Sequence, residues 1–288
     1  MRTTFSLVLF LFVAQMAWAE MPPDSTAHKL GPWRPDLISP DSAAALPELP
    51  LRNAEIRCAL AREELIYTVR YGFISAGEAR LVTEPGPTYD GRPTFRVVGT
   101  GRSTGAFDLV FKVRDHYESH VDQFGLFPHR FIRRVKEGGY RMEREVTFDP
   151  RRRLACTEEK NSEKFQVLPA YCQDLVSAFH FARNLPLDTL PVGGIVEITT
   201  FLDGKVHLVR ARKVGQEHIR VKAGGFDCWL FKPIVQEGRI WADEDDLTIY
   251  VSADARRIPV LVKSNLLVGS VRLELLAQNL TKSTPVPQ

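Results

Sequence analysis

The sequence has little net charge, few cysteines and, after its first twenty residues, no long apolar run. Its 288 residues include 38 Lys and Arg against 35 Asp and Glu, a formal charge of +3. This small, scattered excess argues against a protein that binds nucleic acid. With 44% hydrophobic and 25% charged residues, the composition is close to the globular average. It argues against disorder, collagen, a coiled coil and a multispanning membrane protein.

The first nineteen residues are typical of a secretory signal peptide. Arg2 supplies positive charge, Phe5 to Val13 is almost wholly apolar, and Ala17-Trp18-Ala19 matches a small-x-small cleavage site. The apolar run is shorter than the roughly 20 residues that a bilayer-spanning helix needs. This length favours cleavage after Ala19 over an uncleaved anchor. We therefore predict an exported, soluble protein that does not span the membrane and is a monomer.

Export would place the four cysteines in a compartment where disulfides form. Cys156 and Cys172 are close in the chain, so a local bridge is the simplest pairing, which leaves Cys58 with Cys228. Four cysteines allow three connectivities, and their spacing does not choose among them. No Cys-x-x-Cys pair or nearby histidine spacing supports a zinc site. We predict disulfides and no metal site.

Proline content divides the chain. Residues 20–50 contain seven of the nineteen prolines, among them Pro22, Pro23 and Pro50. Proline removes backbone donors and favours extended geometry, so residues 20–51 are predicted to form a semi-rigid lead-in, from which Trp33 could dock on the body. Residues 52–278 are predicted to form a single β-rich domain, and residues 279–288 a disordered tail.

Apolar residues of the predicted domain recur mostly at every second position. Leu65, Tyr67, Val69 and Tyr71 alternate with polar residues, as expected of a half-buried strand. Similar patterns predict strands over residues 94–98, 112–121, 131–135, 140–148, 195–202, 205–212, 218–221, 228–233, 247–252, 260–264 and 270–276. Asp203-Gly204 suits a two-residue type I′ hairpin turn, and Asp90-Gly91 and Gly138-Gly139 are weaker signals of the same kind.

One segment is predicted to be a helix. Asp174 is a suitable N-cap, apolar residues recur at helical spacing from Leu175 to Ala182, and Pro186 ends the pattern. About twelve strands with one helix at about residues 174–184 exclude a doubly wound α/β fold. They predict a mainly β protein: a single rolled or spiral antiparallel sheet, or an open barrel, with the helix packed against it.

One motif suggests catalysis. Gly101-Arg102-Ser103-Thr104-Gly105 fits the G-x-S-x-G nucleophile elbow, which makes Ser103 a weak catalytic candidate. An elbow needs a strand, a tight turn and a helix above a parallel sheet. The segment Ala106 to Val121 favours a strand instead, and the chain has no late histidine beyond His218. We therefore favour a Gly-rich strand connection. Gly72 to Gly77 lacks the Lys and Ser/Thr of a phosphate loop and is interpreted as a strand turn.

The remaining charged motifs are interpreted as solvated surface. His116 and His120 would lie on one strand face about 13 Å apart, too far for one metal ion. The acidic run Asp243 to Asp246 could bind calcium, but a solvated hairpin tip is favoured because glycine and alternating oxygen ligands are missing. The basic residues of 130–136 and 151–153 could face an anionic envelope surface, although solvent-side strand positions account for them. No cofactor is predicted.

Four short motifs follow one another in a defined order. They are Asp115-His116-Tyr117-Glu118-Ser119, Gly125-Leu126-Phe127-Pro128, Asp174-Leu175-Val176-Ser177 with Arg183, and Tyr250 to Val260 followed by Gly269 and Leu273. Together, over about residues 64–276, they resemble an exported bacterial family, the domain of unknown function 3108 (DUF3108). The resemblance implies a periplasmic protein of Gram-negative bacteria with no established reaction. Its sheet is similar to the spiral β-rolls of envelope-integrity proteins, a likeness of fold alone.

The residues of these motifs are interpreted as structural rather than catalytic. Asp174 and Arg183 bracket the predicted helix, so they would anchor its ends to the sheet by capping and ion pairing. Asp254 would form a turn at the end of a strand, before Arg257-Ile258-Pro259. The full set of structural candidates is Asp115, Tyr117, Asp174, Ser177, Arg183, Asp254, Arg257 and Pro259.

Export, a rolled sheet and 28 aromatic residues without a coherent catalytic set favour one function. We expect a periplasmic, non-enzymatic envelope protein that binds an apolar or amphipathic ligand (a lipid, lipoprotein or glycan) in the sheet concavity. One alternative is an envelope hydrolase, an esterase or glycan-cleaving enzyme, that uses Ser103 or the acidic residues near Asp243. Another is a protein-interaction module in which the proline-rich lead-in docks a partner.

Overall fold

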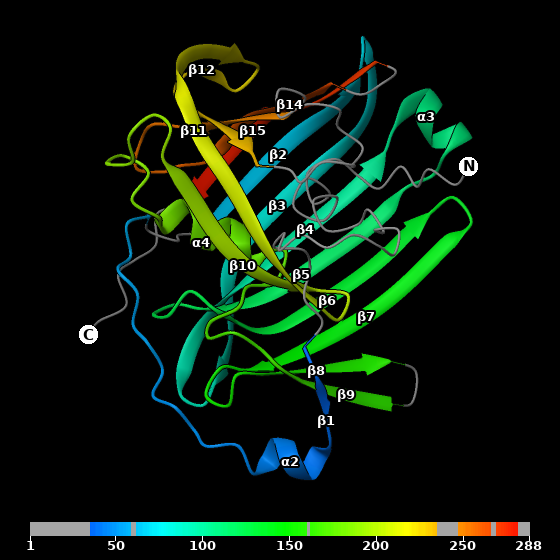
Figure 1. Ribbon diagram of the computed structural model, residues 1–288. Coiled ribbons are helices and arrows are strands. Elements are labelled where there is room, and N and C mark those ends of the chain that lie inside the picture. Colours follow the sequence, from blue (N-terminus) through cyan, green and yellow to red (C-terminus); the bar gives the residue numbers. More distant parts are fainter. Residues whose placement is uncertain (1–34, 59–61, 160–161, 235–246, 266–268, 282–288) are drawn as a thin grey trace, which may run out of the picture.

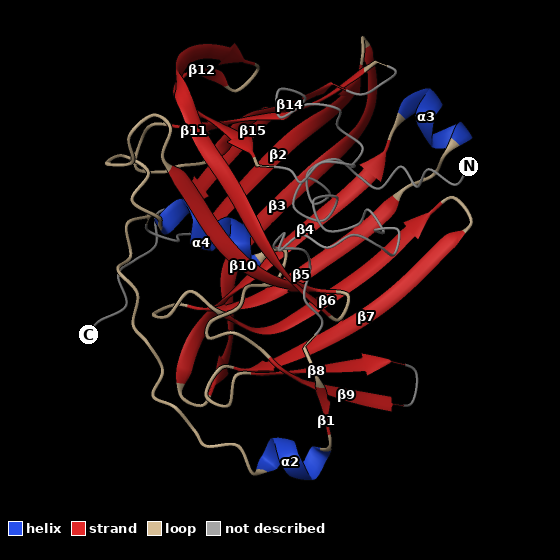
Figure 2. Cartoon of the chain, viewed as in Figure 1, coloured by secondary structure: helices blue, strands red, loops and turns tan. Residues whose placement is uncertain are grey.

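The computed structural model describes residues 35–58, 62–159, 162–234, 247–265 and 269–281. Most of them form one antiparallel sheet of 15 strands, in the order β1-β9-β8-β7-β6-β5-β4-β3-β2-β15-β14-β13-β12-β11-β10 (Figures 1 and 2). The strands are β1 (Leu37–Ile38), β2 (Arg62–Tyr71), β3 (Ile74–Tyr89), β4 (Arg92–Ser103), β5 (Arg114–Asp122), β6 (Pro128–Glu137), β7 (Tyr140–Asp149), β8 (Leu154–Glu159), β9 (Ser162–Val167), β10 (Ile195–Leu202), β11 (Lys205–Val221), β12 (Gly224–Pro233), β13 (Leu247–Ser252), β14 (Pro259–Asn265) and β15 (Ser270–Thr281). The helices are α2 (Pro40–Ala44), α3 (Gly105–Val110) and α4 (Ser177–Asn184).

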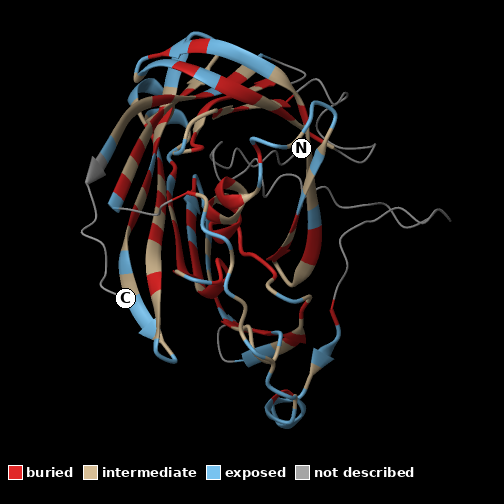
Figure 3. Cartoon of the chain, turned by 90° about the vertical axis from the view of Figure 1, so that its left-hand side faces the viewer, coloured by how far each residue is buried: buried red, intermediate tan, exposed pale blue. Residues whose placement is uncertain are grey.

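The predicted mainly β fold is confirmed. Strands β2 to β9 follow the chain as hairpins, and so do β10 to β15; the two series meet where β2 pairs with β15. The alternation read in the sequence gives the sheet one apolar face: Leu65, Tyr67 and Val69 of β2 are all buried in the main core. Figure 3 shows the same alternation of buried and more exposed residues along other strands. The core therefore lies on the inner face of the curved sheet.

The β10–β11 hairpin folds across the inner face of the roll (Figure 1). Its tip is the predicted two-residue turn, in which Asp203 and Gly204 both have positive φ, at 52° and 73°. Arg133 of β6 and Arg144 of β7 donate to the Asp203 carboxylate, and Gln166 of β9 donates to the Gly204 carbonyl at 3.2 Å. Side-chain hydrogen bonds, and not backbone pairing with β6, β7 or β9, thus hold this tip. The sheet is therefore rolled but does not close into a barrel.

The predicted helix is confirmed as α4, which lies inside the roll (Figure 1). It is preceded by a capping turn: the Asp174 carboxylate accepts from the Ser177 amide at 2.8 Å, and the Ser177 hydroxyl accepts from the Asp174 amide at 2.8 Å. This reciprocal arrangement satisfies two amides that would otherwise lack partners. The helix itself begins at Ser177, three residues after its predicted start.

The strand prediction differs from the structure in several places. Only Gly72 and Phe73 form the turn predicted for 72–77, because β3 begins at Ile74. Strands β1, β3, β8 and β9 are not among the predicted strands, and residues 205–212 and 218–221, predicted as two strands, belong to the single strand β11. The strand expected over Ala106 to Val121 is wrong in its first part, where α3 lies. Gly105, with φ of +59°, turns the chain out of β4 and into this helix.

Part of the proline-rich lead-in packs on the sheet. Strand β1 pairs with β9, and the Pro50 carbonyl accepts from the Tyr171 hydroxyl at 3.2 Å. That hydroxyl in turn accepts from the Arg52 amide at 3.0 Å. At the other end of the chain, β15 continues to Thr281, three residues into the predicted tail. The described lead-in is therefore ordered against the domain.

The predicted disulfides are not formed: all four cysteines are free. Cys156 alternates along β8 with the buried Ala155 and Thr157, so it points to the other face of the sheet, whereas Cys172 packs in the core cluster that contains Ala155. Cys58 and Cys228 are both buried. The Cys58 thiol donates instead to the Arg256 carbonyl at 3.4 Å.

Four predictions concern residues outside the described ranges: the signal peptide at 1–19, Trp33, the acidic run at 243–246, and the tail from Lys282. Within those ranges, none of the helices has the length and apolar character needed to cross a bilayer.

Candidate functional site

A cavity of about 200 Å³ lies between α4 and the inner face of strands β10 to β14. It is larger than the roughly 150 Å³ apolar cavity that stays dry and admits benzene. Ala178 and Ala182 line it from the helix, and Ile198, Phe231 and Ile249 line it from the sheet. Its walls are almost entirely apolar, and it can therefore hold a short alkyl chain or a single ring.

The sequence of α4 creates this space. Ala178 and Ala182 are four residues apart and so share one face of the helix. The strands opposite carry branched and aromatic side chains. Because the alanine side chains are single methyl groups, the side chains of the strands do not fill the space between the sheet and this face of the helix. A larger side chain at position 182 would occupy the cavity.

Two arginines line the cavity, and both are already engaged. Arg183 forms a bidentate ion pair with Glu63 at 2.6 and 2.9 Å and also donates to the Arg256 carbonyl at 2.7 and 2.9 Å. Arg257 donates to the Leu185 carbonyl at 2.7 Å. A second Arg257 contact joins the Asp188 carboxylate at 3.2 Å. Their charges are therefore balanced within the protein, and the cavity presents a mainly apolar surface.

Several of the motif residues meet at the C-terminal end of α4. Arg257 binds the last carbonyls of the helix, and Arg183 connects the helix to β2 through Glu63. Asp254 binds Arg256 in the preceding turn, and the Pro259 carbonyl accepts from the Tyr67 hydroxyl at 3.0 Å. These contacts position one wall of the cavity. Glu63, which no motif included, is the partner that sequence reasoning missed.

The N-terminal end of α4 is attached to β5. The Asp174 carboxylate is fully buried and accepts from the Ser119 hydroxyl at 2.6 Å. Burial raises the pKa of Asp174 to about 6, against the lowering effect of the Ser119 and Ser177 hydrogen bonds. Further along the helix, His180 hydrogen-bonds to Thr83 of β3 at 3.2 Å. Polar contacts thus fix the helix at a set distance from the sheet.

Asp115 and Tyr117 lie elsewhere on the inner face and do not line the cavity. Asp115 accepts from the Lys136 amide at 3.1 Å. Burial and the neighbouring Glu137 carboxylate raise the pKa of Asp115 to about 7. The Arg133 guanidinium lies 5.8 Å from the centre of the Tyr117 ring. The structure therefore separates these two residues from the rest of the motif set.

Ser103 ends β4, and α3 follows, so the motif does have a strand–turn–helix context. Its hydroxyl donates to the Asp108 carboxylate at 2.6 Å and accepts from the Val113 amide at 2.8 Å. Asp108 also forms an ion pair with Arg114. Among the described residues, no histidine hydrogen-bonds to Ser103, and the sheet is antiparallel. These contacts tie the start of β5 to the end of β4.

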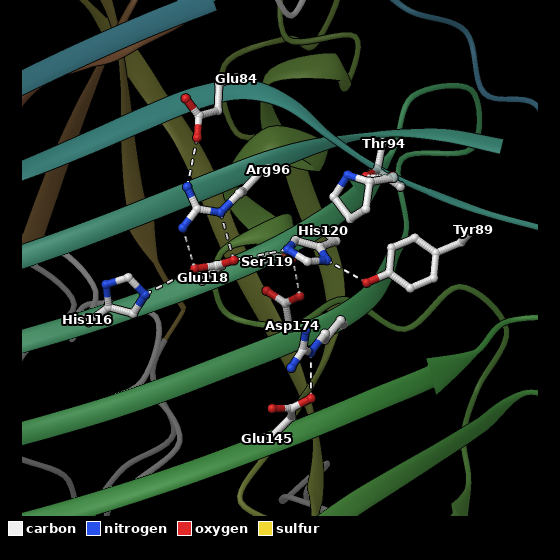
Figure 4. A network of polar contacts seen from close by, with 12 residues as sticks. Glu84, Tyr89, Thr94, Arg96, His116, Glu118, Ser119, His120, Glu145 and Asp174 are labelled. Atoms are coloured by element: carbon white, nitrogen blue, oxygen red, sulfur yellow. Dashed lines mark hydrogen bonds and ion pairs between the residues drawn. The ribbon is translucent and has the colours of Figure 1, made fainter.

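His116 and His120 lie on the outer face of β5 and contact the same carboxylate (Figure 4). The Glu118 side chain lies 3.2 Å from His116 and 3.0 Å from His120, and accepts two bonds from Arg96 at 2.8 Å. Burial raises the pKa of Glu118, but these partners outweigh it and bring the value to about 2. Within the described ranges, no three metal-ligand side chains are grouped to hold an ion. The network joins neighbouring strands.

The family model of DUF3108, a protein family of unknown function, matches residues 66–276. The chain belongs to this family. The match confirms the resemblance drawn from the four motifs. Among curated proteins, no sequence matches this DUF3108 chain.

Three solved structures are similar to the DUF3108 chain. One is a β-barrel-like protein of the DUF1849 domain from Brucella abortus, with 12% identity and a TM-score of 0.49 over 78% of this chain and 100% of that one. The others are a candidate lipoprotein from Parabacteroides distasonis (8% identity, TM-score 0.36, 79% and 100% coverage) and a candidate exported protein with a YmcC-like fold from Bacteroides fragilis (8%, 0.34, 82% and 100%).

Proposed function

We propose that this DUF3108 protein is a non-enzymatic protein of the bacterial cell envelope that holds an apolar chain in the α4 cavity. The observation that carries the proposal is the cavity itself, about 200 Å³ of mostly apolar space between a helix and a curved sheet. Such sites are typical of ligand-binding proteins. The signal-peptide pattern of Met1 to Ala19 supports a periplasmic location.

The lining favours the acyl part of a lipid or lipoprotein over a glycan. Sugar hydroxyls need hydrogen-bond partners when buried, and an unpaired one costs about 1–3 kcal/mol. Arg183 and Arg257, the two charged side chains of the lining, already bind Glu63 and backbone carbonyls. Apolar groups, in contrast, contribute about 0.8 kcal/mol for each buried CH₂. A polar head group would remain outside the cavity.

The test is occupancy of the cavity. The protein is purified after export, examined by native mass spectrometry for a bound lipid, and titrated with a fluorescent fatty acid. We expect Ala182→Leu to weaken and Ala182→Phe to abolish binding, because both side chains extend into the cavity. Ala44→Phe is the matched control, since Ala44 is exposed on α2.

Circular dichroism and thermal melts establish that each variant is folded. Ala182→Leu is the milder change and keeps the test valid if the Phe variant is unstable, since overpacking costs about 1–3 kcal/mol. The proposal fails if the wild-type protein carries no lipid and takes up no probe. It also fails if folded Ala182→Phe binds the probe as the wild type does.

A further inference from the structure

One rim of the roll carries a cluster of exposed apolar side chains. Phe73, Val110 and Leu109 are 96%, 87% and 89% exposed, more than any other large apolar side chain in the described ranges. Ile74 and Tyr140, also exposed, are at the same rim. Single exposed apolar residues need no explanation, but a cluster indicates an interaction site.

The antiparallel order of the strands brings these residues together. The rim is formed by the β2–β3 turn, the α3 segment between β4 and β5, and the β6–β7 turn. The Thr104 amide donates to the Ala76 carbonyl at 3.0 Å, and the Gly138 amide donates to the Lys112 carbonyl at 2.8 Å. The Phe107 ring of α3 meets the Tyr71 ring edge-on at 6.3 Å. Figure 1 shows α3 near the upper end of β2 and β3.

Packing at this rim separates anchoring side chains from projecting ones. Phe107 is half-buried against Tyr71 and holds α3 in place, whereas Leu109 and Val110 are turned away from the sheet. At the β2–β3 turn, the Arg70 guanidinium donates to the Phe73 carbonyl at 3.1 Å and fixes the backbone from which Phe73 projects. The exposed apolar side chains therefore project from segments that ring packing and hydrogen bonds hold in place.

Basic side chains surround the projecting groups. Two carboxylates of this rim are paired with arginines, Asp108 with Arg114 and Glu78 with Arg102. Lys112, Lys136 and Arg141 are also exposed at this rim, in addition to the two paired arginines. The rim thus combines apolar tips with an excess of positive charge.

We propose that this rim docks on the surface of a bilayer that contains anionic phospholipid. Phe73, Leu109 and Val110 enter the interface between head groups and acyl chains, and the nearby lysines and arginines contact the phosphates. Apolar side chains flanked by Lys and Arg are typical of proteins that lie on anionic membranes. A protein partner fits less well, because lysine is depleted from the buried centre of protein interfaces.

This surface is separate from the cavity. Figure 1 shows α3 and α4 in different parts of the roll, and no residue of the rim lines the cavity. The proposal therefore does not depend on the ligand-binding function. A variant of Ala182 that no longer takes up lipid is expected to bind vesicles unchanged.

The test is co-sedimentation of the exported chain with vesicles. One set contains phosphatidylcholine alone, and the other contains phosphatidylcholine and phosphatidylglycerol in equal parts. We expect binding to the phosphatidylglycerol vesicles that weakens as salt is added, since salt screens exposed charges. Phe73→Ser with Leu109→Ser is expected to weaken binding at least tenfold. Lys112→Gln with Arg141→Gln is expected to remove the preference for the anionic lipid.

Val192→Ser is the matched control, because Val192 is also exposed but lies in the loop that precedes β10. Thermal melts of all variants are expected to match the wild type, since the altered side chains are exposed. The proposal is overturned if the wild type does not bind phosphatidylglycerol vesicles, or if Phe73→Ser with Leu109→Ser binds as tightly as the control. The proposal is also overturned if a protein partner cross-links to the wild type but not to Phe73→Ser with Leu109→Ser, while both bind vesicles equally.

Discussion

The ion pair between Arg183 of α4 and Glu63 of β2 provides a direct test of how the helix is held. Both side chains are almost fully buried, with 4% and 6% of their surfaces exposed. Arg183 donates to both Glu63 oxygens and to the Arg256 carbonyl. Replacing Arg183 with Met preserves much of the side-chain volume but leaves the Glu63 carboxylate buried without its counter-ion. We therefore expect Arg183→Met to be strongly destabilising.

The size of the effect follows from the burial. Removing one partner of a buried pair costs about 3–5 kcal/mol, because the remaining charge is left uncompensated. Such a loss is a large part of the roughly 5–15 kcal/mol by which native proteins are stable. At about 2–4 °C for each kcal/mol in a domain of this size, the midpoint of thermal unfolding is expected to fall by roughly 6–20 °C.

The assay is urea unfolding followed by circular dichroism and tryptophan fluorescence. Arg210→Met is the control, because Arg210 also binds a glutamate, Glu197, at 2.7 Å, but both side chains are substantially exposed. Exposed pairs contribute about 0–1 kcal/mol. Adding Glu63→Gln to Arg183→Met is expected to restore part of the lost stability, since it removes the uncompensated charge.

The reasoning is refuted if Arg183→Met and Arg210→Met have the same free energy of unfolding. It is also refuted if the Glu63→Gln and Arg183→Met effects simply add, because residues joined by a direct interaction do not contribute independently.

Two further predictions concern Asp115 and Ser103. The pKa of Asp115 is raised to about 7 in the folded protein. Between about pH 4 and pH 7 the folded protein therefore keeps a proton on Asp115 that the unfolded chain has lost. As a result, the contribution of Asp115 to the free energy of unfolding falls as the pH rises through this range. Asp115→Asn should therefore reduce the fall of the urea midpoint with pH between about pH 4 and pH 7. If the urea midpoint of the variant depends on pH as that of the wild type does, the raised pKa of Asp115 is contradicted. Ser103→Ala should cost about 1–3 kcal/mol, because it leaves the buried Val113 amide without its acceptor, and should not alter lipid retention. A loss of esterase activity at unchanged stability would instead indicate a catalytic serine.

The sequence predicted the fold where one face of a strand is buried and the other is exposed. In β3 the same rule failed because Gly77 resembled a turn residue. A Cβ there would lie 2.6 Å from the Arg102 carbonyl oxygen of β4, so glycine is needed for close strand packing rather than for a turn. Strands β8 and β9 lie near the edge of the sheet and contain many polar residues, so they lack a clear apolar alternation.

The cavity was less accessible to prediction than the fold. Its walls come from α4 and from strands β10 to β14, and their distances are set by the roll rather than by any local pattern. The sequence pattern places Ala178 and Ala182 in a helix. It does not show that their small side chains leave a cavity, because the cavity exists only where the helix lies opposite the sheet. Cysteine number and expected export suggested disulfides, although the alternation along β8 directs Cys156 away from Cys172.

The pairing of β2 with β15 has a consequence for biosynthesis. Tyr71 of β2 lies opposite Val271 of β15, 200 positions later in the chain. During synthesis, β2 can form a hairpin with β3 at once, but its other edge has no partner until β15 has emerged. An unpaired strand edge is a site for aggregation, and contacts so distant in sequence form slowly. A chain cut short before β15 would expose this edge in the centre of the sheet, so correct assembly depends on protecting it until synthesis is complete.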